Sequence, residues 1–222
     1  MSYLKVKDSI HYSQSDDKCS SLMTYCQQNN YLYGDKEFPP TNASLFQDPP
    51  HPAYDNSFKG VSWDRAENIF GKNNYNVFKN IDPCDIKQGG LGDCYFLCSL
   101  SSLSEQPQLI SRLFDFDTIN PNGVHSVWLF INGKWNNFLI DEYFPVTKKT
   151  NGPQLSFSKA KENEIWVILL EKCYAKAYGS FWDIVGGDPV HALRDLTGAP
   201  YDRISDFSNL DFVWQQLMSS VA

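Results

Sequence analysis

Residues 88–98, QGGLGDCYFLC, join a glycine-rich turn to the start of an apolar segment. Three glycines fall within four residues of the turn, and the run CYFLCSLSSLS that begins at Cys94 carries no charge. Leucines recur every three residues along that run, which predicts a helix over 94–104 that is buried on nearly all sides. The stretch therefore predicts a flexible turn leading into a buried helix whose first residue is a cysteine.

The remaining pattern predicts more helices and one hairpin. Asn132-Gly133 separates two runs rich in aromatic and β-branched residues, VHSVWLF and WNNFLIDEYF, which is a strong hairpin signal. Apolar spacing and capping residues predict further helices at 17–28, 107–114, 164–178, from Asp188-Pro189 onward, and at 209–220. This order has no βαβ alternation, so the fold class expected is α+β and helix-rich.

Three segments are expected to lack regular structure. Residues 1–16 are polar and predict a flexible N-terminal segment. Residues 38–58 are rich in proline, which predicts an extended wrap over the surface anchored by Phe38, Leu45 and Phe46. Residues 147–162 predict a polar, lysine-bearing loop.

Composition narrows the class of protein. The chain has 222 residues, 42% hydrophobic and 20% charged, with a net charge of -7, which argues against non-specific binding to nucleic acid or anionic membranes. No apolar run approaches the roughly 20 residues that span a bilayer, and no secretory segment opens the chain, so a cytoplasmic protein is expected. The six cysteines show no zinc-type spacing, so free thiols are expected.

The position of Cys94 favours a reactive thiolate. Unpaired N–H groups and the helix dipole at a helix start attract an anion, and a thiolate is such an anion. The Cys94 N–H and the side-chain amide of Gln88, six residues earlier, can converge on one carbonyl oxygen as an oxyanion hole. These residues indicate acyl transfer with Cys94 as the nucleophile.

The same turn is also compatible with roles that involve no such chemistry. Glycine-rich turns before helices are common, and most cysteines at helix starts have no chemical role. A phosphate-binding turn is disfavoured, because it lacks a G-x-x-x-x-G-K-[ST] pattern. Thiol transacylation of the transglutaminase kind would need a different nucleophile motif.

At this motif the sequence resembles the calpains, the calcium-dependent papain-like cysteine proteases, whose nucleophile pattern is close to Q-G-x-L-G-D-C-W. Further segments are similar to the family over roughly residues 17–218: EFPPTNASLF, VSWDR, GVHSVWLFINGKWNNFLIDEYFPV, EIW, LLEKCYAK, GG at 186–187 and DLTG at 195–198. Tyr95 departs from the pattern, since it stands where the family usually has tryptophan. The resemblance implies a papain-like half-core with a central helix that starts at the nucleophile.

The resemblance also implies roles for single residues. Cys94 corresponds to the nucleophile and Gln88 to the oxyanion-hole glutamine. Calpains bind Ca2+ in each half of the protease core, and the side-chain ligands of the first half correspond to Asp85 and Glu164. The backbone carbonyl ligands correspond to Phe78 and Asn80. Carboxylates suit a hard cation that prefers oxygen, although Asp85 could instead cap a turn and Glu164 could stabilise a helix start.

The family's catalytic histidine and asparagine lie in G-H-A and N-P-W-G motifs, and neither motif occurs here. His125 and His191 are interpreted as structural. The expectation is therefore that residues 17–222 form only the first, cysteine-bearing subdomain of a calcium-dependent cysteine endopeptidase acting on protein substrates, inactive without the second half of the core. The alternative is a non-catalytic half-core that binds calcium or a partner protein.

Overall fold

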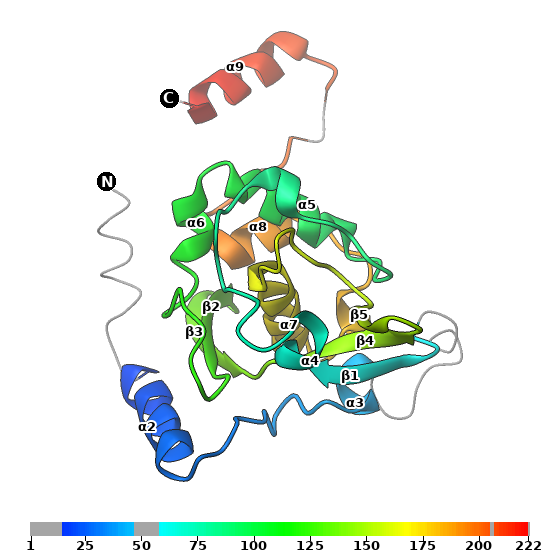
Figure 1. Cartoon of the computed structure of the whole chain (residues 1–222). Helices are drawn as coiled ribbons and strands as arrows, with labels where there is room; N and C mark the ends of the chain where they lie inside the picture. Colours follow the sequence, from blue (N-terminus) through cyan, green and yellow to red (C-terminus); the bar gives the residue numbers. More distant parts are fainter. Residues whose placement is uncertain (1–14, 47–57, 205–206, 222) are drawn as a thin grey trace.

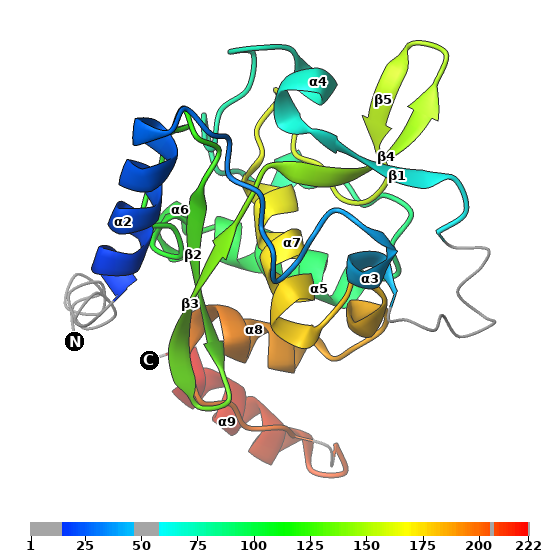
Figure 2. The ribbon, with the colours of Figure 1, turned by 90° about the horizontal axis from the view of Figure 1, so that it is seen from below.

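The computed structural model describes residues 15–46, 58–204 and 207–221. Helix α7 (Trp166–Tyr178) stands at the centre of the fold, with α5 (Cys94–Ser104) and α8 (Pro189–Thr197) along one side (Figure 1). Two small antiparallel sheets lie on other sides of α7, as the view from below shows (Figure 2). Helices and antiparallel strands thus surround one core, which confirms the predicted α+β class.

Helix α7 is more deeply enclosed than its pattern predicts. All ten residues from Trp166 to Ala175 are buried, including the charged Glu171 and Lys172. The ring of Tyr174 stacks on Phe96 of α5, with centroids 4.3 Å apart, so the two helices meet through aromatic faces. An amphipathic pattern therefore understates how much of this helix is covered by the rest of the chain.

Helix α5 has the predicted bounds and is buried on most sides, but not all. Cys94, Cys98 and Ser102 are exposed, and their four-residue spacing places them on one stripe of the helix. The stripe carries small, weakly polar side chains, so its exposure costs little. Cys94, the candidate nucleophile, therefore lies at the N-terminal end of this exposed stripe.

The predicted hairpin is confirmed. Strand β2 (His125–Ile131) pairs with β3 (Lys134–Ile140), with Ile131 opposite Lys134. The two turn residues both adopt positive φ, 54° at Asn132 and 76° at Gly133, as a tight hairpin turn requires.

The second sheet was not predicted from the sequence. Strands β1 (Val61–Arg65), β4 (Tyr143–Lys149) and β5 (Gly152–Leu155) pair in the order β1-β4-β5, all antiparallel. The expectation of a polar loop over 147–162 is therefore wrong for its first part, which belongs to β4 and β5. The lysines there lie near the end of the sheet, where exposure of their charges is compatible with pairing.

The N-terminal half also departs from expectation in one place. Helix α2 (Ser15–Gln28) confirms the predicted helix, with Cys19 and Cys26 buried on one face. The proline-rich segment contains a short helix, α3 (Asn42–Leu45), so it is not wholly irregular; Phe38 and Leu45 are buried anchors as predicted. The rest of that segment, 47–57, and most of the segment predicted to be flexible, 1–14, lie outside the described residues.

The remaining elements are short, except for the last helix. They are α4 (Ala66–Phe70), η2 (Pro83–Asp85), α6 (Pro107–Ser111) and η3 (Trp182–Ile184). Helix α9 (Leu210–Val221) lies apart from the body in Figure 1 and exposes a row of large apolar side chains, including Leu210, Trp214 and Leu217.

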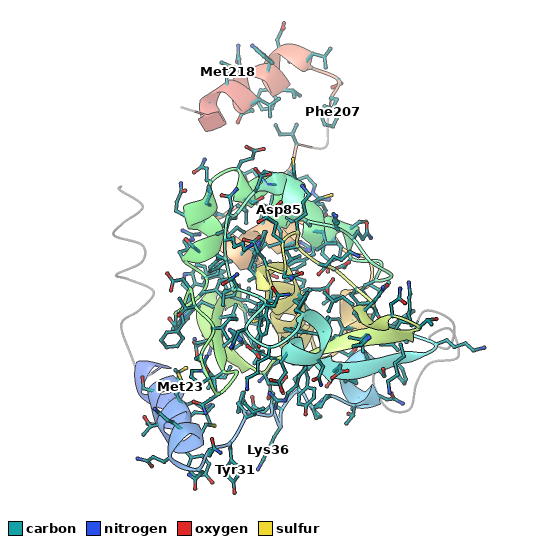
Figure 3. The ribbon with its side chains drawn as sticks, in the orientation of Figure 1. Met23, Tyr31, Lys36, Asp85, Phe207 and Met218 are labelled. Carbon is teal, nitrogen blue, oxygen red and sulfur yellow. The ribbon has the colours of Figure 1, made fainter. Side chains whose placement is uncertain are left out.

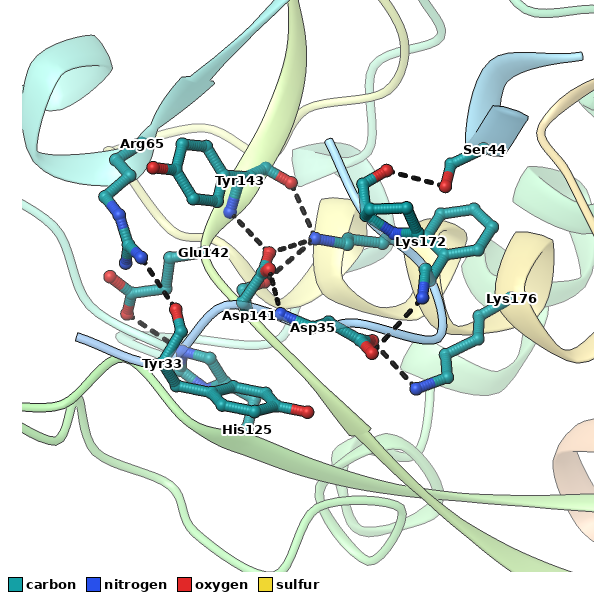
Figure 4. Close-up of polar contacts among 12 residues, drawn as sticks. Tyr33, Asp35, Ser44, Arg65, His125, Asp141, Glu142, Tyr143, Lys172 and Lys176 are labelled. Carbon is teal, nitrogen blue, oxygen red and sulfur yellow. Dashed lines mark hydrogen bonds and ion pairs between the residues drawn. The ribbon is translucent and has the colours of Figure 1, made fainter. Parts of the chain in front are cut away.

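A buried network of ion pairs and hydrogen bonds joins residues 33–38 to α7 (Figure 4). Lys172 donates to the Asp141 carboxylate and, at 2.7 Å, to the Tyr143 carbonyl. Asp141 also accepts the Asp35 backbone N–H at 2.7 Å, and the Asp35 carboxylate pairs with Lys176 at 2.7 Å. Residues 33–38 are thereby fixed across the centre of the fold.

Candidate active site

The candidate nucleophile lies where the sequence predicts it. Cys94 is the first residue of α5 and is exposed. The turn before it, residues 88–93, leads from η2, and η2 packs against α5. Figure 3 labels Asp85, the last residue of η2, on the α5 side of the molecule. Asp85 therefore lies on the same side of the molecule as α5, the helix that begins at Cys94.

The first half of the turn is held by backbone contacts to residues 156–159. Lys87 and Lys159 exchange backbone hydrogen bonds of 2.9 and 3.0 Å, and the Gly90 N–H donates to the Ser156 carbonyl at 2.8 Å. A Cβ atom on Gly89 would lie 1.9 Å from the Phe157 carbonyl oxygen. Glycine is required at that position because two backbones meet there.

Gln88 lies at the start of the turn with an exposed side chain. Its Nε2 donates one hydrogen bond of 3.1 Å to the Leu91 carbonyl, so the amide is folded back over its own turn. An amide nitrogen carries two hydrogens, and the second remains able to donate to a ligand. This arrangement is compatible with an oxyanion donor.

The second half of the turn ends in a buried acid pair that sequence reasoning missed. Asp93 is the N-cap residue of α5, yet its side chain makes no capping hydrogen bond and is fully buried. Its carboxyl faces that of Glu171 on α7. Burial raises the Asp93 pKa to about 6, and burial, then the Asp93 charge, raises the Glu171 pKa well above its usual value. A glutamate inside the apolar run of α7 was the available signal.

Three of the four predicted calcium ligands line one cavity of about 210 Å³: Asn80, Asp85 and Glu164. Glu164 Oε1 accepts the backbone N–H groups of Lys79 and Asn80, the latter at 2.7 Å. The carboxylate therefore joins the 77–81 loop to the start of α7. Phe78 does not line this cavity; its ring packs edge-on against Phe114 at 5.0 Å.

The donor set fits a hard cation. Two more carboxylates, Asp82 and Glu162, line the same cavity and were not predicted. Lys161 also lines the cavity, with its Nζ 3.5 Å from Asp85 Oδ1. The carboxylates around the cavity therefore already attract one positive group, as they would attract a cation. Within the described ranges, no three histidine, cysteine, aspartate or glutamate side chains are grouped so as to hold a metal by themselves. Backbone carbonyls would have to complete the coordination.

Two histidines have other partners. His125 is buried and its Nε2 lies 2.9 Å from Glu142 Oε1. His191, on α8, has Nε2 3.2 Å from the Tyr201 hydroxyl. His11 and His51 lie outside the described residues.

The sequence pattern of the calpain family cysteine protease matches residues 33–222. The chain belongs to the calpain family of cysteine proteases. The pattern extends over the nucleophile turn, both sheets and every helix from α3 onward, so the family resemblance noted in single motifs is confirmed along the chain.

Individual calpain relatives agree with this assignment. The chain is 34% identical to the calpain-type cysteine protease ADL1 of Oryza sativa subsp. japonica over 203 residues, and to DEK1 of Zea mays over the same length. It is 32% identical to the calpain-1 catalytic subunit of Sus scrofa over 182 residues. These alignments cover 84% and 80% of this chain but only 9% of the plant proteins and 24% of calpain-1.

The calpain assignment makes this chain a homologue of peptidases.

No helix in the described parts of the chain is long and apolar enough to cross a membrane.

Proposed function

We propose that this calpain chain supplies the nucleophile and oxyanion hole of a calcium-dependent cysteine endopeptidase that cleaves protein substrates in the cytoplasm. One observation carries the proposal: an exposed Cys94 starts α5 directly after a turn whose backbone is fixed at Gly89 and Gly90. A nucleophile on a rigid, solvent-facing helix start is what acyl transfer requires.

The chemistry follows from the residues of the turn. The Cys94 thiolate attacks the scissile carbonyl carbon, and the electron pair of the C=O bond moves to oxygen. The Cys94 N–H and the free hydrogen of the Gln88 amide donate to that oxygen. The tetrahedral intermediate expels the amine as a proton is transferred to its nitrogen, and water later hydrolyses the thioester.

A general base and acid is required for these proton transfers. We assign it to a histidine in a second half of the protease core, because of the two described histidines His125 is buried against Glu142 and His191 contacts the Tyr201 hydroxyl. Residues 1–222 alone are then expected to lack peptidase activity. Cleavage of casein by this chain with Ca2+, abolished by Cys94→Ala, would contradict that expectation.

The nucleophile is tested by comparing three exposed thiols in one molecule: Cys84, Cys94 and Cys98. A neutral peptidyl epoxide should alkylate Cys94 at least about tenfold faster than Cys98, because only Cys94 stands at the helix start. Peptide mass spectrometry gives the three rates. Cys98 lies one turn along the same stripe and is the matched control; equal rates at the two sites would reject the assignment.

We further propose that Asp85 and Glu164, with the backbone carbonyls of Phe78 and Asn80, hold Ca2+. The shared cavity of Asn80, Asp85 and Glu164 supports this, as does the Lys161 ammonium beside Asp85. A bound cation would supply charge neutralisation for these carboxylates. Glu164 already bonds the 77–81 loop, so the site lies on the chain path to Gln88.

Titration calorimetry with Ca2+ tests the cation site. Asp85→Ala and Glu164→Ala should each weaken binding by at least about tenfold, since each removes a carboxylate ligand. Asp211→Asn on the distant α9 is the control for loss of one negative charge. Unchanged affinity in both site variants would exclude these ligands.

The alternative is a non-catalytic half-core that binds calcium or a partner protein. The exposed apolar row on α9 favours a partner surface. In that case Cys94 would react with the epoxide no faster than Cys98, while Ca2+ binding would persist.

A further inference from the structure

Two acidic side chains face each other in the core directly behind the nucleophile. Asp93 and Glu171 expose 0% and 2% of their surfaces, respectively. Apart from the Asp93 backbone N–H and the Glu171 carboxyl, no hydrogen-bond partner for either oxygen of Asp93 is found among the described residues. Two facing carboxylates repel each other strongly when both are charged in such surroundings, so while they stay in contact one is protonated and donates to the other.

The orientation of Asp93 leaves the helix start open. An aspartate at an N-cap ordinarily accepts hydrogen bonds from the first-turn N–H groups. Here the Asp93 backbone carbonyl accepts from Phe96 at 2.9 Å, but its carboxylate makes no cap. A capping carboxylate would place a negative charge at the helix start, where an oxyanion has to form. Turning it inward removes that competition.

Glu171 connects both ends of the turn. Its Oε1 accepts the Ser158 backbone N–H at 3.1 Å, and residue 158 lies in the segment that bonds Gly90 and lies against Gly89. The same carboxyl meets Asp93 at the other end of the turn. A single side chain on the buried α7 thus contacts the anchors on either side of residues 88–93.

We propose that Asp93 and Glu171 share one proton, that this pair positions the turn 88–93 and Cys94 for catalysis, and that loss of the proton releases the turn. Both are positioning residues, because they act through Gln88 and Cys94. The catalytic part of this inference rests on the proposed function; the coupling between proton and turn does not.

The charge state follows from the surroundings of each carboxyl. Glu171 carries the proton and donates it to the Asp93 carboxylate, since burial and the Asp93 charge disfavour ionised Glu171. As pH rises, the proton passes to solvent and two negative charges face each other. Repulsion then separates Asp93, at the helix start, from α7.

Few other titratable groups act on this pair. On α5 the nearby titratable group is Tyr95. Burial is the main reason that its pKa is raised to about 12. The 156–159 segment contributes the Ser158 N–H. The neighbouring Lys172 on α7 is directed to Asp141. Among the described residues neither carboxyl forms an ion pair, so no cation holds the doubly charged pair together.

Hydrogen–deuterium exchange on this chain tests the inference. Protection of residues 88–94, corrected for the intrinsic exchange rate, should fall by about tenfold or more in the wild type between about pH 6 and about pH 10. In Glu171→Gln, residues 88–94 should stay protected across this range, because the introduced side-chain amide donates to Asp93 at every pH. Glu171→Leu, without a donor, should be poorly protected throughout. The β2–β3 hairpin is the internal reference.

Two outcomes separate this inference from the proposed function. The same pH response in the wild type and Glu171→Gln would overturn the inference, even if the epoxide selects Cys94. Unselective epoxide labelling with a pH response confined to the wild type would leave the coupling standing and reject Cys94 as the nucleophile. If Glu171→Gln does not fold, Asp93→Asn replaces it, since the amide that this substitution introduces donates to the Glu171 carboxylate.

Discussion

At the scale of single residues, Asp93 makes stability depend on pH. Burial raises its folded pKa from 3.8 to about 6, so the native state binds more protons than the unfolded state between these values. Stability from this group is therefore greatest below its unfolded pKa and falls as pH rises through the folded pKa. Above about pH 7 the full cost is about 3 kcal/mol.

Replacing the titrating group should remove this dependence. The free energy of unfolding of Asp93→Asn, relative to the wild type, should rise by about 2.5 kcal/mol from about pH 4 to about pH 7. Urea denaturation at a series of pH values measures the difference. Asp211→Asn, on the surface of α9, should show no comparable trend, and a flat difference for Asp93→Asn would contradict the assignment.

Single residues also mark the limit of sequence reading. Cys94 and Gln88 stand in a local motif, so their neighbourhood could be inferred from spacing alone. Asp93 and Glu171 are 78 positions apart by their numbers, and only the packing of α7 against α5 brings them together. Charged residues are seldom buried without a partner, so sequence gives little reason to place both in the core.

At the scale of elements, the turn before α5 depends on close backbone contact. A Cβ on Gly89 would meet the Phe157 carbonyl oxygen at 1.9 Å, and neither backbone can move without breaking the Lys87–Lys159 pairing. Gly89→Ala should therefore lower the free energy of unfolding by about 3 kcal/mol and slow epoxide labelling of Cys94.

Gly34→Ala is the matched control for that substitution. Beyond residue 34 and its two chain neighbours, no heavy atom lies within 4 Å of the Cβ it would add, so its stability should stay close to that of the wild type. Urea denaturation and labelling rates measured on both variants check the prediction. A stable Gly89→Ala with normal labelling would mean that the turn tolerates displacement.

The elements predicted correctly are those with local signals. Asn132-Gly133 specifies the hairpin, and Asp188, whose carboxylate accepts the Val190 N–H at 3.0 Å, caps α8. The β1-β4-β5 sheet has no such signal, because β1 pairs with a strand about eighty residues later. Proline is unfavourable between two strands, so Pro145 in β4 gives a signal against a strand. The structure accommodates it because β5 pairs with β4 only from Val146 onward, which leaves Pro145 with one neighbouring strand.

At the scale of the whole molecule, the fold depends on charges buried around α7. Lys172 is fully enclosed and is held by Asp141 and the Tyr143 carbonyl (Figure 4). Asp141 also accepts the backbone N–H of Asp35, so this ion pair joins residues 33–38, the β3–β4 connection and the central helix α7. Burial lowers the Lys172 pKa, whereas the Asp141 charge opposes that shift.

Breaking this pair should cost more than any surface ion pair. Lys172→Met leaves the Asp141 charge buried and unpaired, so the free energy of unfolding should fall by about 3–5 kcal/mol. Lys79→Met, which removes a half-exposed lysine 3.4 Å from Glu162, should change it by less than about 1 kcal/mol. Adding Asp141→Asn to Lys172→Met removes the stranded charge yet keeps an acceptor for the Asp35 N–H. The double variant should therefore be more stable than Lys172→Met alone; if it is less stable, the cost lies in lost packing of the lysine stem rather than in the charge.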